Sequence, residues 1–194
     1  MRTTTRAALA CLTVIGALTA MPAAAQAAPP GTDGSKPVRT VEKTVEKGYA
    51  LNCSGRSGDV SVAVDLYQNS AFGSHTGVSV ETPEGEYGGG YGPEDTVLFS
   101  DGAVTATVPL RKLDDTREPA GDAVVTGTYA TAGRPTRVHE VIEDPAGHYV
   151  VTRGTNTRLD ASVTADVLGR TVPLSCSTAF AFDLTVLRFT TGRG

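Results

Sequence analysis

The clearest pattern in the chain is an alternation of side chains between positions 172 and 186. Residues at the even positions are mostly large and apolar, and those at the odd positions are mostly small or polar. This period of two predicts a half-buried β-strand whose even-numbered side chains face the core. Those residues are Val172, Leu174, Cys176, Thr178, Phe180, Phe182, Leu184 and Val186.

This run is too long for one straight strand. At about 3.3 Å per residue it would extend roughly 50 Å, whereas ordinary strands have about five or six residues. We therefore expect a bend or bulge near positions 177–179, which would let one apolar stripe serve two parts of the core.

Shorter apolar or alternating runs recur along the chain, separated by turns rich in Gly, Pro and Asp, and no convincing amphipathic helix lies between Gly55 and Thr190. About nine to eleven strands of this kind predict an all-β fold. We expect a single antiparallel β-sandwich or a partly closed barrel. The other expected strands are residues 40–53, 60–67, 78–81, 97–99, 104–110, 123–130, 138–142, 149–152 and 159–167.

Two turns set the pairing of their flanking strands. The Asp-Gly pair at positions 101–102 favours a type I′ hairpin, because this turn needs positive φ at both central residues. It should pair Phe99 with Val104, and Val97 with Ala106. A second turn, at positions 169–170, should place Val167 opposite Val172 and Val163 opposite Cys176, with the cysteine on the core side.

The cysteines and the first residues together indicate export. Residues 1–27 read as a secretory signal peptide, with early arginines, an apolar run at 7–20 and a small-residue cleavage site. Cys11 would leave with this segment, so Cys53 and Cys176 remain as an even pair, which predicts one disulfide in an oxidising compartment. We expect a secreted, extracellular protein. Few lysines, no tryptophan and abundant Ala, Gly, Thr and Val are typical of a bacterial source.

The rest of the chain divides simply. Residues 28–37 read as a disordered linker, residues 38–190 as one β-sandwich domain and residues 191–194 as a tail. The net charge is −4, and nucleic acid or an anionic membrane surface would require clustered Lys and Arg instead. No apolar run reaches the roughly 20 residues needed for a helical membrane span.

A glycine-rich segment at positions 85–93 has the most unusual composition in the chain. Its five glycines and one proline predict an irregular loop. Such a loop would present Tyr87 and Tyr91, whose rings offer large contact areas and hydroxyl groups to a partner. The alternative is a simple connection with both tyrosines packed on the domain edge.

Catalytic and metal motifs are weak. No Gly-x-Ser-x-Gly elbow is present, so a catalytic triad would have to be dispersed, for example Ser74 and His75 with a distant Asp. The adjacent acidic pairs lack the spacing of a calcium loop. His139, Glu143 and His148 would share one hairpin face, but His139 and Glu143 are about 13 Å apart along a strand, too far for one ion. We expect no cofactor and no metal.

These observations favour a secreted, non-catalytic β-sandwich protein that binds an unknown protein or glycan at the cell surface or outside. One alternative is a secreted hydrolase with a dispersed active site. Another is a protease inhibitor, which would expose a rigid convex loop near the disulfide.

Overall fold

The computed structural model describes residues 38–143 and 148–192. These residues form ten strands: β1 (Val38–Ser57), β2 (Val60–Asn69), β3 (Gly73–Thr82), β4 (Gly85–Glu94), β5 (Phe99–Ser100), β6 (Ala103–Lys112), β7 (Pro119–Thr131), β8 (Thr136–Glu143), β9 (Tyr149–Val167) and β10 (Arg170–Gly192). The predicted signal peptide and linker lie outside the described residues, and β10 ends at Gly192, two residues beyond the expected end of the domain. No helix in the described part of the chain is long and apolar enough to cross a membrane.

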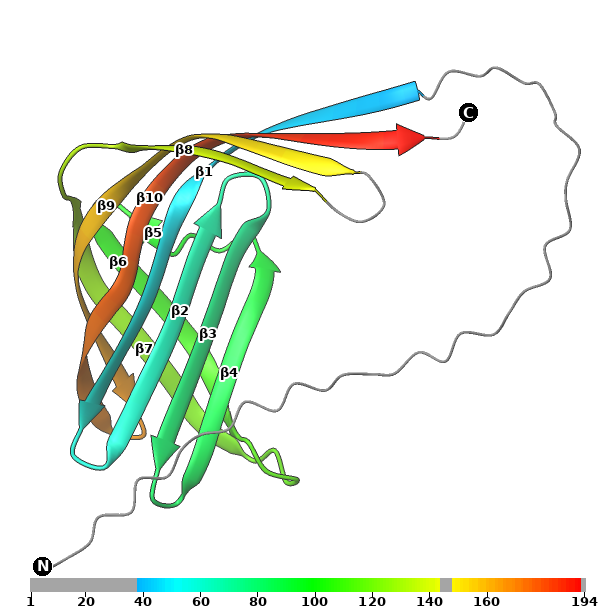
Figure 1. Ribbon diagram of the computed structural model, residues 1–194. Helices are drawn as coiled ribbons and strands as arrows, with labels where there is room; N and C mark the ends of the chain where they lie inside the picture. The colour runs from blue at the N-terminus through cyan, green and yellow to red at the C-terminus, as the bar shows by residue number, and fades with distance from the viewer. Residues whose placement is uncertain (1–37, 144–147, 193–194) are drawn as a thin grey trace, which may run out of the picture. The chain divides into compact units, whose positions relative to one another are not determined.

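The ten strands belong to one antiparallel sheet that curls into a partly closed ring (Figure 1). Around the ring the order is β10, β1, β2, β3, β4, β6, β7 and β9, and β9 pairs with β10 again. The seam between β4 and β6 has only two residue pairs, so the ring is not a regular barrel. The all-β prediction is confirmed, with the partly closed barrel as the correct alternative because there is one sheet rather than two.

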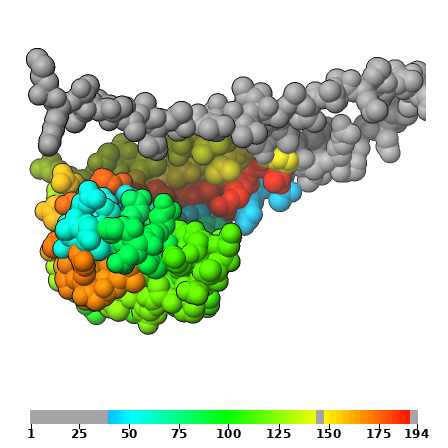
Figure 2. All heavy atoms as spheres, turned by 90° about the horizontal axis from the view of Figure 1, so that it is seen from below, coloured from blue at the N-terminus to red at the C-terminus, as the bar shows by residue number. Residues whose placement is uncertain are grey.

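The interior of the ring is the hydrophobic core. Residues 60–67 of β2 and residues 103–111 of β6 alternate between buried and accessible positions, and the buried ones are Val, Leu and Ala. Val80, Val108, Ala123 and Val125 have no exposed surface. The end of the ring seen in Figure 2 is filled by atoms and shows no open channel.

Strand β8 and the ends of three ring strands form an arm beyond the ring. The arm consists of β8, residues 149–156 of β9, residues 183–192 of β10 and residues 38–47 of β1 (Figure 1). The arm passes over the end of the ring that carries the β2–β3 turn. The Arg188 guanidinium lies 5.5 Å from the centre of the Phe72 ring in that turn. Asn69 also donates a 3.0 Å hydrogen bond to Glu46. These contacts tie the base of the arm to the ring.

The bulge expected in the long strand is confirmed. Asn52 of β1 lies opposite Thr178 and Cys53 lies opposite Cys176, so Ser177 is an extra residue in β10. A shift of one residue moves side chains to the other face of a sheet. The even stripe is therefore split, and the prediction that it faces the core throughout is wrong.

On the two sides of this bulge, different side chains face inward. Val172 and Leu174 belong to the core inside the ring. After the bulge Ala179 lies opposite the buried Leu51, and therefore faces inward, while Phe180 and Phe182 face the outside of the ring. The two small alanines at 179 and 181 pack against the core in their place.

The predicted hairpins are partly correct. Asp101 and Gly102 have φ values of 49° and 80°, and Phe99 pairs with Val104 as expected. The expected pair of Val97 with Ala106 is wrong, because the strand begins only at Phe99 and Val97 is 66% exposed.

The second turn falls one residue earlier than predicted. Leu168 and Gly169 are its central residues, with φ values of 50° and 74°, so Val172 lies opposite Ala165 rather than Val167. The shift of two keeps the side chains of this hairpin on their predicted faces, but Val163 now lies opposite Leu174 and not opposite Cys176. On the other side of β10, Cys176 lies opposite Cys53 of β1. Cys53 and Cys176 form the predicted disulfide.

Candidate functional site

The two tyrosines proposed from the sequence lie on strand β4 and have different surroundings. The glycine-rich segment is this strand, so the prediction of an irregular loop is wrong. Tyr87 lies opposite Val80, is half-buried and packs against the core. Tyr91 lies opposite Thr76 and is 39% exposed. Tyr91 is therefore the more accessible of the two residues.

Glycine is required in β4 because neighbouring backbone lies very close to it. A Cβ atom on Gly89 would lie 2.1 Å from the carbonyl oxygen of Pro109, and one on Gly90 would lie 2.6 Å from that of Thr76. Such distances exclude side chains there. Pairing with β3 then overrides the low strand propensity of glycine, which depends strongly on context.

A groove of about 510 Å³ lies beside Tyr91 on the outer face of the ring. We call it the outer-face groove. Its side chains come from two rows of cross-strand neighbours that run across β10, β1, β2 and β3. The first row contains Phe180, Ala50, Tyr67 and His75, and the second contains Thr178, Asn52, Asp65 and Gly77.

The strand register shows that both rows face outward. Between them lies a third row that contains Leu51 and Leu66, which are 2% and 1% exposed and belong to the core. Because successive side chains of a strand point to opposite faces, the rows on either side of these leucines point away from the core.

Gly77 leaves the floor of the groove open. The only atom within 4 Å of a Cβ placed there would be Cβ of Asp65, at 3.8 Å, which is an ordinary contact. A side chain at this position would thus be tolerated by its neighbours and would project into the groove. The residue type at position 77 therefore controls the depth of the groove rather than the packing of the sheet.

Aromatic rings form one wall of the groove. The Tyr67 ring stacks on Phe182, with centroids 5.6 Å apart and planes at 14°, and lies 6.1 Å from the His75 ring. The hydroxyl of Tyr67 accepts a 2.7 Å hydrogen bond from the Asn69 amide. These contacts hold the Tyr67 ring in one orientation before any ligand arrives, which lowers the entropic cost of binding.

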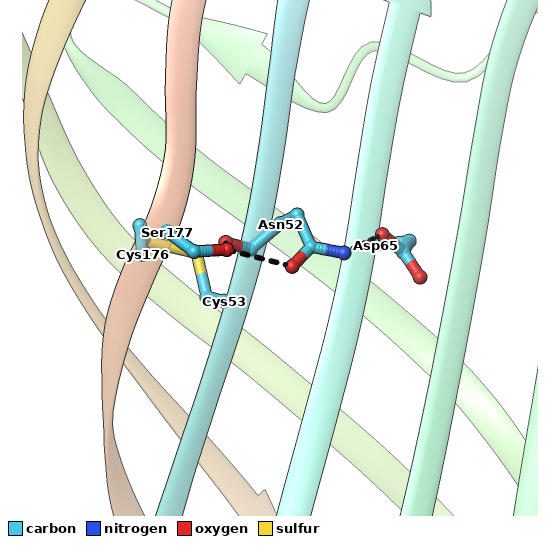
Figure 3. Close-up of a disulfide and its surroundings, with 5 residues drawn as sticks. All are labelled: Asn52, Cys53, Asp65, Cys176 and Ser177. Atoms are coloured by element: carbon cyan, nitrogen blue, oxygen red, sulfur yellow. Dashed lines mark hydrogen bonds between the residues drawn. A yellow bond between two sulfur atoms is a disulfide. The ribbon is translucent and has the colours of Figure 1, made fainter.

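Polar groups form a connected line across the second row (Figure 3). Ser177 Oγ donates to Asn52 Oδ1 at 3.0 Å, and Asn52 Nδ2 donates to Asp65 Oδ1. Asn52 precedes Cys53 and Ser177 follows Cys176, so the disulfide lies directly beside this line. The bulge that makes Ser177 an extra residue is thus what brings its hydroxyl to the Asn52 amide.

The dispersed hydrolase site suggested by Ser74 and His75 is not assembled. Ser74 is 4% exposed and its hydroxyl donates to the backbone oxygen of Thr96, whereas His75 is exposed and lies beside Tyr67. A serine nucleophile needs its base within hydrogen-bond reach. The described residues also contain no group of three or more His, Cys, Asp or Glu side chains suited to a metal ion.

Titratable groups with shifted pKa values lie outside the groove. Hydrogen bonds from Thr116 and Lys112 lower the pKa of Asp114 far below its ordinary value, and Asp114 in turn raises the pKa of Lys112. Burial raises the pKa of Tyr129, which also interacts with Tyr49. None of these residues lines the groove, so these shifts point to local structure and not to a catalytic centre there.

A second depression, of about 580 Å³, lies near the base of the arm. It contains the exposed ion pair between Lys47 and Asp183, 2.8 Å apart, together with Glu94 and Asp95. Exposed pairs of this kind contribute little free energy. Phe182 also lines this depression, so its stacking on Tyr67 does not by itself distinguish the two hollows. The outer-face groove, however, combines the Tyr67 ring of this stacked pair with the hydrogen-bonded line of Ser177, Asn52 and Asp65. We therefore consider the outer-face groove the better candidate site.

No family model, curated protein or solved structure matches the chain. The site must therefore be interpreted from its own chemistry.

Of the residues that line the outer-face groove, the sequence pointed to Tyr91 as a binding residue but missed Asn52, Asp65 and Gly77. These three lie on different strands, and only the register of β1, β2 and β3 brings them into one row. The available signal was a run of outward positions with small or polar residues, which is equally typical of any solvated strand face.

Proposed function

We propose that this protein is an exported, non-catalytic binding protein that holds a glycan in the outer-face groove, at the cell surface or outside the cell. The observation that carries the proposal is the juxtaposition of a preorganised aromatic wall with the amide and carboxylate of Asn52 and Asp65. This proposal commits to a glycan, one of the two partner classes expected from the sequence.

The chemistry of the groove matches that of a sugar ring. A pyranose has apolar C–H faces, which pack on aromatic rings, and hydroxyl groups around its edge, which hydrogen-bond to amides and carboxylates. The groove volume of about 510 Å³ lies within the range of roughly 300–1,000 Å³ typical of small-ligand sites. Tyr91 also lines the groove, at the strand position that continues the row of Leu66 and Thr76.

Export is proposed on two independent grounds. Residues 1–27 have the composition of a secretory signal, and disulfides such as Cys53–Cys176 persist mainly in oxidising compartments. The bacterial source remains a prediction from composition. The acidic net charge of −4 supports the exclusion of nucleic acid as a partner.

Binding of the purified protein to a glycan array tests the proposal. Gly77→Val adds a side chain on the groove side of β3, where its Cβ has only an ordinary contact with Asp65, and Tyr91→Ala removes an aromatic ring that lines the groove. We expect both variants to bind at least about ten-fold more weakly than the wild type, since a lost contact of about 1.4 kcal/mol has that effect.

Ser162→Val provides the matched control, because it places the same side chain on an exposed position of β9 that does not line the groove. Its binding should equal that of the wild type. If no glycan binds, or if Gly77→Val binds every glycan as well as the control does, the proposal is wrong. If a polypeptide binds to the wild type and Gly77→Val abolishes that binding, the partner held in the groove is a protein and not a glycan.

A further inference from the structure

The outer-face groove has an asymmetric charge. Its lining includes the carboxylate of Asp65 but no Lys or Arg side chain. Among the described residues Asp65 takes part in no ion pair, and its one hydrogen-bond partner is the neutral Asn52 amide. The negative charge of Asp65 is therefore not balanced by a neighbouring cation.

The carboxylate of Asp65 is held in position by a hydrogen bond from Asn52, the residue next to the disulfide-bonded Cys53. The side-chain oxygen Oδ1 of Asn52 accepts a hydrogen bond from Ser177 Oγ at 3.0 Å, so the side-chain nitrogen Nδ2 of Asn52 is oriented to donate to Asp65 (Figure 3). Both Asn52 and Ser177 adjoin a disulfide-bonded cysteine, so backbone motion at this point is restricted. The donor to Asp65 comes from β1, and the second carboxylate oxygen remains available to a ligand.

We propose that the groove selects glycans that are neutral or carry amino groups and rejects acidic ones. This inference rests on the proposed function. A hydroxyl or an ammonium group of the ligand donates to Asp65, and a charged acceptor makes a stronger hydrogen bond than a neutral one. A uronate, sulfate or phosphate group would instead face Asp65 without a cation to offset the repulsion.

The negative charge of Asp65 sets the expected order of affinity for amino, neutral and acidic glycans. Amino glycans gain an ion pair with Asp65 and should bind most tightly, and their binding should weaken as salt is added because exposed charges are screened. Neutral glycans bind through hydrogen bonds and stacking and should show little dependence on salt. Acidic glycans of matched size should bind at least about ten-fold more weakly than neutral ones.

The experiment compares chitosan, cellulose and polyglucuronate tetrasaccharides on the same protein, beside an array that covers other linkages within each charge class. Asp65→Asn keeps the shape of the side chain and removes its charge. We expect this variant to lose the preference for amino over neutral glycans and to admit acidic ones. Asp166→Asn is the control, because Asp166 is an exposed carboxylate on β9 outside the groove.

The outcomes separate this inference from the proposed function. If glycans bind in a manner that Gly77→Val abolishes, but acidic glycans bind as tightly as neutral ones, the selectivity is wrong and the function stands. If Asp65→Asn leaves the ranking of the classes unchanged, the role of Asp65 is wrong. If no class binds in a Gly77-dependent way, the proposed function itself fails.

Discussion

Cys53 lies directly opposite Cys176 in the register of β1 and β10, at the position where β10 gains its extra residue, Ser177. The disulfide therefore closes a segment of the chain with a sequence separation of 123. It joins an early strand to the last strand at the point where the long apolar stripe changes face.

Replacing both cysteines with serine should lower the free energy of unfolding. In the loop-entropy model, closure of a loop this long contributes about 5 kcal/mol, and strain or residual structure in the unfolded chain reduces that value. Urea unfolding of the wild type and of Cys53→Ser with Cys176→Ser measures the difference. Peptide mapping without reductant that finds the two cysteines unlinked would contradict the structure.

Gly77 and Gly89 should respond oppositely to the same substitution. Gly77→Ala has room, with its nearest neighbour at 3.8 Å, whereas Gly89→Ala places Cβ 2.1 Å from the Pro109 oxygen. We expect Gly77→Ala to be neutral or to stabilise by up to about 1 kcal/mol and Gly89→Ala to destabilise by about 1–3 kcal/mol. Thermal unfolding of the pair checks this, and equal melting temperatures would show that β4 is not packed as described.

Replacing Tyr87 should mainly lower stability, whereas replacing Tyr91 should mainly weaken glycan binding. Tyr87→Ala removes a half-buried ring packed against the core, and deletion of buried aromatic volume costs up to about 3–5 kcal/mol when burial is complete. Tyr91→Ala removes an exposed ring and should leave the melting temperature almost unchanged while it weakens glycan binding. Calorimetry and binding measurements on both variants separate these effects. If Tyr91→Ala lowered the melting temperature and Tyr87→Ala weakened binding alone, the positions described for the two rings would be wrong.

Asp114 should contribute to stability in a pH-dependent way. Its folded-state pKa is lowered by hydrogen bonds from Thr116 and Lys112, so the contribution is present above the ordinary carboxylate pKa and is lost as the pH falls through the lower, folded-state pKa. Asp114→Asn should therefore be less stable than the wild type at pH 7, and the difference should shrink as the pH falls below about 3.9. A difference in melting temperature that stays constant with pH would oppose this assignment.

The sequence predicted those parts of the fold that depend on local chemistry. The period of two at 172–186 led to β10, and the excess length of that run led to the bulge at Ser177. The Asp101-Gly102 pair led to the tight hairpin because few other dipeptides adopt positive φ twice. The Cys53–Cys176 disulfide followed from the assignment of Cys11 to the signal peptide, which leaves these two cysteines as a pair.

Predictions failed where distant neighbours decide the outcome. β4 is a strand because β3 and the Pro109 backbone surround it, and nothing in a run of glycines reveals such neighbours. Leu168 adopts positive φ within its turn, which few non-glycine residues do, so the sequence predicts this turn one residue too late. The groove was missed for the same reason, since Asn52, Asp65 and Gly77 meet only through the register of three strands.

The most direct test of the glycan-binding groove is to map the backbone amide shifts by NMR while an isotope-labelled sample is titrated with the tightest glycan from the array. We predict that the largest changes occur at Asn52, Asp65 and Gly77, and that the amides of Thr126 and Ser162 on β7 and β9 do not move. Changes confined to the arm, or to the second depression around Lys47 and Asp183, would contradict the assignment of the outer-face groove as the binding site.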